Sequence, residues 1–349
     1  MKVLLISVWK PRKGGIVTHV ENLLKHSRNS FTILTYRDRK ARKEPGVIRV
    51  PIVDIPVLRG ITFTLFSFLR ALRKNFDLIH AHYAMPQGLA GALIKKTRKK
   101  PFVITVHGSD LTVLGESRLY RPVLKWVFNE ADAIIAVSRH IEKLLTCLGV
   151  DARKINVIYS GVDPQPPAVE GERRVVFIGA LVWQKGVDTL IEAFKDIKRS
   201  FPDATLVIVG DGGERENLKS QAQRLGLKDI LFTGYLEDLD NIFTSQTVLV
   251  LPSRKEGFGL TLLEAMARGV PVVGSKSGGI PEIIHDGRNG YLFSTGNFLS
   301  LADAVKKIFA NDDVRARLIN GGLETVKNFT WSQTSEETDD VYEKISTSL

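Results

Sequence analysis

The stretch "VLVLPSRKEGFGLTLLEAMARGVPVVGS", residues 248–275, shows the pattern that repeats through the whole chain. An apolar run of strand length is followed by a glycine-rich turn, a segment with helical periodicity and a second apolar run. The helical segment should begin around Gly259, and Gly269 followed by Pro271 should end it. A strand, a crossover helix and a second strand predict two parallel neighbours in one sheet.

The same alternation of strand and helix patterns occupies both halves of the chain. In the first half the strand candidates are "KVLLIS", "FTILT", "GVIRV", "DLIHAH", "PFVITVHG" and "ADAIIAVS". In the second half they are "RVVFIGAL", "ATLVIVGDG", "DILFTGY", "VLVLPS", "PVVGS" and "GYLFS". We therefore expect an α/β fold with two tandem doubly wound parallel-sheet domains. Ligands of such sheets bind beyond the carboxyl ends of the strands, so we also expect a cleft between the domains.

A proline-rich segment separates the two halves. It has three prolines within residues 164–167, where neither a helix nor a central strand can run. The segment that follows the second predicted sheet has a helical pattern, and we expect it to pack back against the first domain. The predicted parts are a domain over 1–163, a linker over 164–172, a domain over 173–330 and a C-terminal helix over 331–349.

Composition limits the class of protein. The 349 residues are 44% hydrophobic and 25% charged, as in a folded globular protein. Cys147 is the single cysteine, so an intramolecular disulfide or a cysteine-cluster metal site is excluded. The apolar part of "MKVLLISVWK" is too short for a secretory signal, and we expect a cytoplasmic protein.

The net charge of +11 is unevenly distributed. Residues 1–160 hold 28 Lys and Arg against 11 Asp and Glu, a net charge of +17, and the remainder carries −6. A field of this sign attracts an anionic acceptor or an anionic membrane surface. It also raises the alternative of a nucleic-acid-binding protein. We do not expect nucleic acid as a partner, because the basic residues are scattered and no stacking-aromatic or reading-helix motif accompanies them.

The segment "RGITFTLFSFLRALRKNF", residues 59–76, is a candidate for membrane contact. One helical stripe is expected to pack on the sheet, and it consists of Ile61, Leu65, Phe68, Leu69 and Leu72. Phe63 and Phe66 fall outside the stripe and are expected to be exposed beside basic residues, as in a peripheral membrane protein. The alternative is that both aromatic rings are buried against a neighbouring helix.

Glu256 and Glu264 stand on either side of the turn that opens the helix after Gly259. The amides of residues 258–261 are free N-terminal donors, which suit a diphosphate. Glu264 could accept from both hydroxyls of a ribose, and Glu256 would then lie near a transferred sugar. The alternative is that Glu264 is a charge near the helix N-terminus and Glu256 a solvated loop residue.

Three further positions follow predicted strands. Lys185 could neutralise a diphosphate leaving group, although a solvated lysine is an equally plain interpretation. His107 ends an apolar run, so its ring should emerge at a carboxyl end unless it is structural. Gly14 and Gly15 precede a helix, where amides can receive an anion or a sugar hydroxyl, or they serve a turn that needs positive φ.

These motifs together resemble family 4 of the retaining glycosyltransferases, nucleotide-sugar enzymes of the GT-B fold. The resemblance extends over essentially the whole chain, and it includes "GGIVTHV", "HAHYAMPQGLAG", "VITVHGSD", "VFIGALVWQKGVDTLIEAF", "LVIVGDGGERENL" and "DGRNGYLF". It implies a metal-independent enzyme without a cofactor, with the donor on the second domain and the acceptor on the first. An anionic or lipid-linked acceptor fits the charge of that domain.

The resemblance also implies roles for individual residues. Glu264 corresponds to the ribose ligand, Glu256 to a residue beside the donor sugar, and Lys185 to the group that stabilises the departing phosphate. The remaining implied positions are Phe258, Gly259, Leu260 and Thr261 along the diphosphate and sugar, His107 facing the donor sugar, and Gly14 and Gly15 bordering the acceptor.

One position departs from the family pattern. Ala180 stands where members often have an arginine that joins the lysine at the diphosphate. Donor affinity should be weaker unless Arg254, Lys255 or a lysine of the first domain substitutes for it. The nearest alternative functions are a nucleotide-sugar epimerase and a sugar phosphorylase of similar fold.

Overall fold

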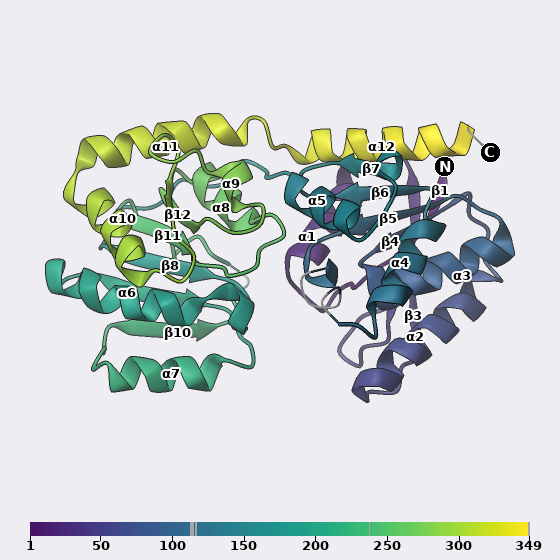
Figure 1. Cartoon of the computed structure of the whole chain (residues 1–349), viewed down its shortest axis with the longest axis horizontal. Helices are drawn as coiled ribbons and strands as arrows, with labels where there is room; N and C mark the ends of the chain where they lie inside the picture. Colours follow the sequence, from purple (N-terminus) through teal and green to yellow (C-terminus); the bar gives the residue numbers. More distant parts are fainter. Residues whose placement is uncertain (112–114, 116, 237, 348–349) are drawn as a thin grey trace. The chain divides into compact units, whose positions relative to one another are not determined.

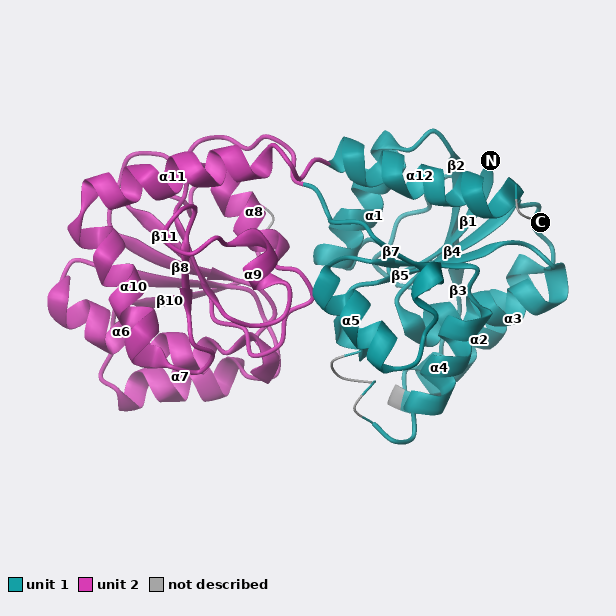
Figure 2. Cartoon of the chain, turned by 45° about the horizontal axis from the view of Figure 1, so that its top comes forward, with its two compact units in different colours: residues 1–161, 331–349 teal, residues 162–330 magenta. Residues whose placement is uncertain are grey.

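The computed structural model describes residues 1–111, 115, 117–236 and 238–347. Two compact units make up the chain (Figure 2): unit 1 is Met1–Gly161 with Trp331–Leu349, and unit 2 is Val162–Thr330. The chain thus enters unit 2 at Val162, two residues before the predicted linker, and returns to unit 1 at Trp331. Each unit is a parallel sheet covered by helices (Figure 1), which confirms the predicted α/β class.

The sheet of unit 1 has seven parallel strands in the order β3-β2-β1-β4-β5-β6-β7. Their bounds are β1 Lys2–Ile6, β2 Ser30–Tyr36, β3 Val47–Val50, β4 Leu78–His82, β5 Phe102–Val106, β6 Ala133–Ala136 and β7 Ile155–Val157. The sequence predicts the first six. It misses β7, an edge strand of three residues in which Asn156 interrupts the apolar run.

Helices cover both faces of this sheet. Their bounds are α1 Gly15–His26, α2 Pro56–Ala71, α3 Leu89–Arg98, α4 Arg121–Glu130, α5 Arg139–Cys147 and α12 Trp331–Thr347. α1 packs beside α12, and α2 packs beside α3, which is followed by α4 (Figure 1). The fully buried strands β4 and β5 lie between the two helical layers.

The orientation predicted for α2 is wrong. Phe63 is fully buried and stacks on Tyr36 with 4.1 Å between ring centroids, whereas Ile61 and Leu65 are 56% and 51% exposed. The helix has two apolar faces, and the buried one also carries the small residue Ser67. A small side chain lets the backbone approach the layer beneath, so the bulkier leucine stripe faces outward.

The sheet of unit 2 has six parallel strands in the order β10-β9-β8-β11-β12-β13. The strands are β8 Arg174–Ile178, β9 Thr205–Val209, β10 Ile230–Gly234, β11 Thr247–Leu251, β12 Val272–Ser275 and β13 Tyr291–Phe293. The helices are α6 Val187–Ser200, α7 Arg215–Arg224, α8 Leu260–Ala267, α9 Ile280–Ile283, α10 Phe298–Ala310 and α11 Asp312–Val326. α6 lies between α7 and α10, while α8 packs against α11 (Figure 1).

The last helix, α12, is anchored to unit 1 by buried polar contacts. The Asp339 carboxylate is 2% exposed and accepts hydrogen bonds from Ser27 Oγ at 2.6 Å, the Arg28 amide at 2.9 Å and Asn29 Nδ2 at 2.8 Å. Tyr342 beside it is fully buried in the core of the sheet. Because the carboxylate satisfies donors at the end of α1, it fixes the position of α12 along that helix.

Asp339→Ala should destabilise unit 1 by about 2–3 kcal/mol, because three donors lose a charged acceptor in a buried site. Urea unfolding followed by circular dichroism measures the change. Asp340→Ala is the matched control, since that neighbouring carboxylate is 67% exposed and lies 3.6 Å from the Arg28 guanidinium at the surface. Equal effects of the two substitutions would contradict the anchoring role.

Candidate functional site

The loops that follow β8, β11 and β12 meet at one edge of the sheet of unit 2. β8 and β11 are neighbours at the point where the strand order reverses, which is the usual ligand position in open α/β sheets. The loop 179–186 carries Lys185, and the loop 252–259 carries Glu256. The sequence assigned both residues to post-strand loops, and the strand order makes those loops adjacent.

Two glycines allow these loops to pack closely against one another. Gly186 has φ of 65°, and a Cβ there would collide with the carbonyl oxygen of Pro252. Gly278 has φ of 59°, and a Cβ there would collide with the carbonyl oxygen of Glu256. Both positions need glycine for conformation and for space, so the three loops pack closely into one surface.

Lys185 and Glu256 form an ion pair at this edge. Lys185 Nζ lies 2.7 Å from Glu256 Oε2, and Ser253 Oγ donates to the same oxygen at 2.9 Å. The lysine and glutamate side chains are 26% and 11% exposed. Within the described residues, Oε1 of Glu256 has no recorded partner, so it can accept a hydrogen bond from a ligand. Ser253 was not predicted, because its contact depends on the loop conformation.

The Arg254 side chain is held by hydrogen bonds to other residues of unit 2. Its guanidinium donates to both oxygens of Asp188 at 2.7 and 2.6 Å and to the Trp183 carbonyl at 3.0 Å. A bidentate pair of this kind holds the side chain in one direction. Arg254 therefore does not substitute for the arginine that Ala180 replaces. Ala180 itself is exposed.

The start of α8 presents backbone donors. Gly259 precedes the helix with φ of 105°, and the Leu262 amide returns to its carbonyl at 2.9 Å. Among the residues that the structure describes, no acceptor is recorded for the amides of Gly259, Leu260 and Thr261. Three amides at a helix N-terminus can bind an anion.

The Phe258 side chain does not belong to this surface. It is 5% exposed, and its ring lies 5.9 Å from that of Phe329, between centroids. A ligand at the start of α8 can therefore meet only the backbone of Phe258.

Glu264 lies one turn into α8. No hydrogen bond or ion pair to its carboxylate oxygens is recorded in the described part of the chain. Burial raises its pKa to about 7, although the nearby Arg268 guanidinium acts in the opposite direction. A desolvated carboxylate without donors is suited to a ligand that brings hydroxyl groups.

On unit 1, His107 belongs to a cluster of four histidines. It follows β5 at the carboxyl end, as predicted, and is half-buried. Its Nε2 lies 3.1 Å from His82 Nδ1, and the His19 ring is 5.1 Å away between centroids. His80 completes the cluster, with its Nδ1 at 2.6 Å from the Tyr342 hydroxyl and its Nε2 at 2.7 Å from Thr105 Oγ1.

Burial keeps the cluster neutral. It lowers the pKa of His19 to about 4 and, with repulsion from His19, that of His80 to about 3. The pKa values of His82 and His107 also fall well below the ordinary value, chiefly through burial. In the His82–His107 pair one nitrogen must donate to the other, so both rings cannot be cations while that bond exists.

Asp110 links the segments that follow β4 and β5, the strands that carry His80 and His82 and lead to His107. Its buried carboxylate accepts the amides of Ala84 at 3.1 Å and Gly108 at 3.0 Å. Burial raises its pKa to about 6, against the effect of these amides. The sequence shows Asp110 in a polar loop but not this bridging role.

Gly14 and Gly15 are exposed at the N-terminus of α1. Gly14 has φ of 125°, and apart from its own helix and chain neighbours no described residue would come within 4 Å of a Cβ at either glycine. No side chain caps the helix. Positive φ accounts for Gly14, whereas Gly15 leaves the α1 amides uncovered.

Family models match nearly the whole chain. Glycosyltransferase Family 4 matches residues 13–166, and Glycosyl transferases group 1 matches residues 162–325. The chain belongs to these glycosyltransferases. An uncharacterised glycosyltransferase of Methanocaldococcus jannaschii is 35% identical over 99% of both chains. N-acetyl-α-D-glucosaminyl L-malate synthase of Bacillus anthracis is 30% identical over 73% of this chain and 71% of its own length.

Solved structures show the same GT-B fold for this glycosyltransferase. Sucrose-phosphate synthase of Thermosynechococcus elongatus has a TM-score of 0.85 at 22% identity and covers 100% of both chains. HepE of Anabaena, solved in complex with UDP-glucose, has a TM-score of 0.84 at 22% identity and covers 99% of both chains. The resemblance to the family and the GT-B fold are thereby confirmed.

Acidification should weaken unit 1. An unfolded histidine has a pKa of about 6.5, so below that pH the unfolded chain binds protons that the folded cluster excludes. The free energy of unfolding of unit 1 therefore has its full histidine contribution above pH 7.5 and loses it toward pH 5. At pH 5 the lowered pKa of His19 alone reduces this free energy by about 2 kcal/mol. The raised pKa of Asp110 acts in the opposite direction. Hydrogen exchange of the β4 and β5 amides between pH 5 and 7.5, corrected for intrinsic rates, measures the effect.

His19→Gln should reduce the slope of that pH dependence by the share of His19, because glutamine keeps a polar side chain but does not titrate, while His80, His82 and His107 remain. A slope unchanged by this substitution, or an equal slope in β8 and β11 of unit 2, would contradict the assignment to the cluster.

Proposed function

We propose that this glycosyltransferase takes its sugar from a nucleoside diphosphate donor bound on unit 2 and transfers it with retention of configuration. The observation that carries the proposal is the set of polar groups around the start of α8. They are the Lys185–Glu256 ion pair, the amides of residues 259–261 and the Glu264 carboxylate, and for these amides and this carboxylate no partner is recorded among the described residues. HepE of Anabaena has been solved with UDP and with UDP-glucose, which supports a donor of this class.

The diphosphate is assigned to the α8 amides and Lys185. The amides donate to one phosphate, with the partial positive charge of the helix end. The lysine ammonium has three N–H donors, so it can reach a phosphate oxygen while one proton stays with Glu256. Because Arg254 is held by Asp188, Lys185 is the cation that we assign to the leaving group. The lysine ammonium and the amides at the start of α8 make a metal ion unnecessary in this proposal.

The two carboxylates serve the two ends of the donor. Glu264, for which no donor is recorded among the described residues, accepts from both hydroxyls of the ribose. Glu256 has Oε2 occupied by Lys185 and Ser253, which leaves Oε1 for a hydroxyl of the transferred sugar. In the transfer, the bond between the anomeric carbon and the diphosphate breaks, and a bond to an acceptor oxygen forms on the same face. The proton of the acceptor hydroxyl passes to the departing diphosphate.

The acceptor is assigned to unit 1. The uncovered amides at Gly14 and Gly15 can bind a hydroxyl or an anionic group, and His107 is the half-buried member of its cluster and can contact a sugar hydroxyl. A neutral imidazole suits that role, since it can donate and accept.

Glu264→Ala should weaken nucleoside diphosphate binding about 10- to 100-fold, because two charge-assisted hydrogen bonds to the ribose are lost. A thermal-shift panel of nucleoside diphosphates and their sugars selects the ligand, and calorimetry measures the affinity. The ionised carboxylate is the binding form, so the gap between wild type and Glu264→Gln should widen from pH 6 to pH 8. Unchanged affinity at both pH values would remove Glu264 from the donor site.

Glu256→Gln should lower turnover about 100-fold or more while nucleoside diphosphate affinity stays within a few-fold. The nucleotide does not depend on Glu256, and loss of its charge leaves Lys185 free for the phosphate. Turnover is followed by proton NMR of donor hydrolysis without acceptor, where the retained anomer should appear first.

Arg199→Gln, at the exposed end of α6, serves as a control with one charge removed outside the site. A parallel loss of turnover and nucleotide affinity in Glu256→Gln would indicate that the ion pair merely supports the loops. An inverted anomer as first product would refute retention.

A further inference from the structure

The outward face of α2 carries an apolar stripe. Ile61, Leu65 and Leu69 are 56%, 51% and 46% exposed, and Leu58 and Leu72 are 41% and 36% exposed. At 100° per residue these five side chains fall within an arc of about 80°. The stripe lies opposite the buried face of α2, so folding of unit 1 leaves it uncovered.

The stripe is a concentration of apolar surface and not a random scatter. Of the nineteen exposed large hydrophobic residues that the structure describes, eight lie within residues 53–72. They are Val53, Ile55, Val57, Leu58, Ile61, Leu65, Leu69 and Leu72. Single exposed apolar residues need no explanation, but a contiguous patch marks a contact surface.

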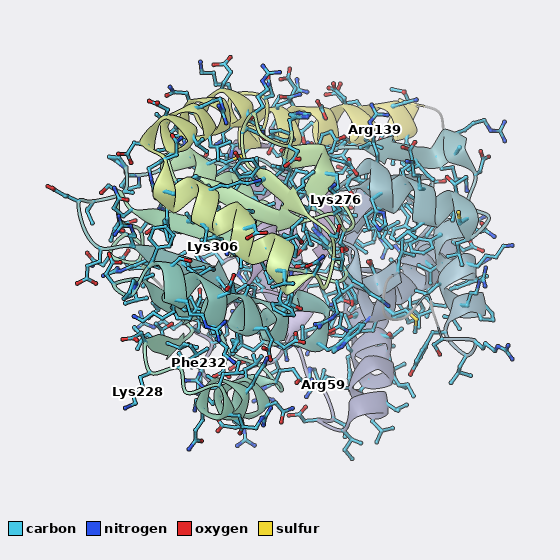
Figure 3. The ribbon with its side chains drawn as sticks, turned by 60° about the vertical axis from the view of Figure 1, so that its left-hand side comes forward. Arg59, Arg139, Lys228, Phe232, Lys276 and Lys306 are labelled. Carbon is cyan, nitrogen blue, oxygen red and sulfur yellow. The ribbon has the colours of Figure 1, made fainter. Side chains whose placement is uncertain are left out.

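Basic residues accompany the stripe on one side. Residues 55–76 contain Arg59, Arg70, Arg73 and Lys74 and no acidic residue. Figure 3 shows Arg59 on α2, where it pairs with Asp54. Arg70, Arg73 and Lys74 are exposed, and no ion pair is recorded for them within the described residues.

The neighbouring helix α3 extends the positive charge. Arg98 donates to the carbonyl of Leu72 at 2.6 Å, which joins the end of α3 to the end of α2. Lys99 beside it is exposed, whereas Lys96 pairs with Glu130 at 2.8 Å. The C-terminal end of the stripe is therefore bordered by cations from two helices.

We propose that this face of α2 docks unit 1 on the surface of a membrane that contains anionic lipids. The leucine stripe would enter the boundary between headgroups and acyl chains, and the arginines and lysines beside it would bind lipid phosphates. No helix in the described part of the chain is long and apolar enough to span a bilayer. The 16-residue α2 would accordingly lie along the surface.

A lipid surface fits these observations better than a protein partner. Arg70, Arg73 and Lys74 line one side of the stripe, and no ion pair is recorded for them within the described residues. A self-complementary surface between two copies would bring these cations close together. The docking is independent of the transfer reaction, and its test needs neither donor nor acceptor. Its failure would leave the donor assignment on unit 2 intact.

Vesicle sedimentation with the full chain tests the proposal. We expect binding to phosphatidylcholine vesicles that contain phosphatidylglycerol, and at least tenfold weaker binding to phosphatidylcholine alone. Raising the salt from about 0.05 to 0.5 M should release the protein, because the Debye length shortens to a few ångströms. Absence of binding to the anionic vesicles at low salt overturns the proposal.

Variants separate the apolar and electrostatic parts. Leu65→Ser and Leu69→Ser should each reduce partitioning about tenfold, and Arg70→Gln and Arg73→Gln about fivefold each. Leu299→Ser on unit 2 is the matched control, since Leu299 is 56% exposed and should not matter. Circular dichroism checks folding, and an equal loss in the control overturns the assignment to α2.

Light scattering during gel filtration tests the alternative that a second copy of the chain covers the stripe. A wild-type chain that is monomeric agrees with a lipid surface. A dimer that Leu65→Ser converts to monomer would assign the stripe to a second copy of the chain and overturn the proposal.

Discussion

The carboxyl ends of β8, β11 and β12 meet at one edge of the second sheet because these strands run parallel, and the loops that follow them meet there as well. This constraint joins Lys185 to Glu256, which are 71 positions apart in the chain. The glycines at 186 and 278, which have no Cβ, then let these loops approach one another closely. The ion pair is thus held by the sheet, and its geometry is available before any ligand arrives.

The local part of this arrangement could be predicted from the sequence. The turn at Gly259, the helix that follows and its end near Gly269 depend on residues within one or two turns, and the structure has them at the expected places. The family resemblance rests on the same local motifs. The pairing of Glu256 with Lys185 and Ser253 could not be predicted, since it depends on strand order and loop conformation.

Two further features show the limits of periodicity. A pattern of apolar residues identifies α2 as a helix, but with two apolar faces it does not decide which one is buried. Part of the histidine cluster is visible in the sequence, because His80 and His82 are two positions apart on one strand and must point to the same face. His19 joins them from α1, and only the packing of that helix on the sheet reveals it.

The return of the chain to unit 1 has a consequence for the order in which the protein is made. Tyr342 closes the core of unit 1 and holds His80, yet it is synthesised after the whole of unit 2. On the ribosome, unit 2 can therefore complete its sheet first, while unit 1 waits with an open face for the last seventeen-residue helix. The N-terminal half of the chain is in this sense the last part to mature, and loss of the C-terminus would damage the beginning of the protein more than its middle.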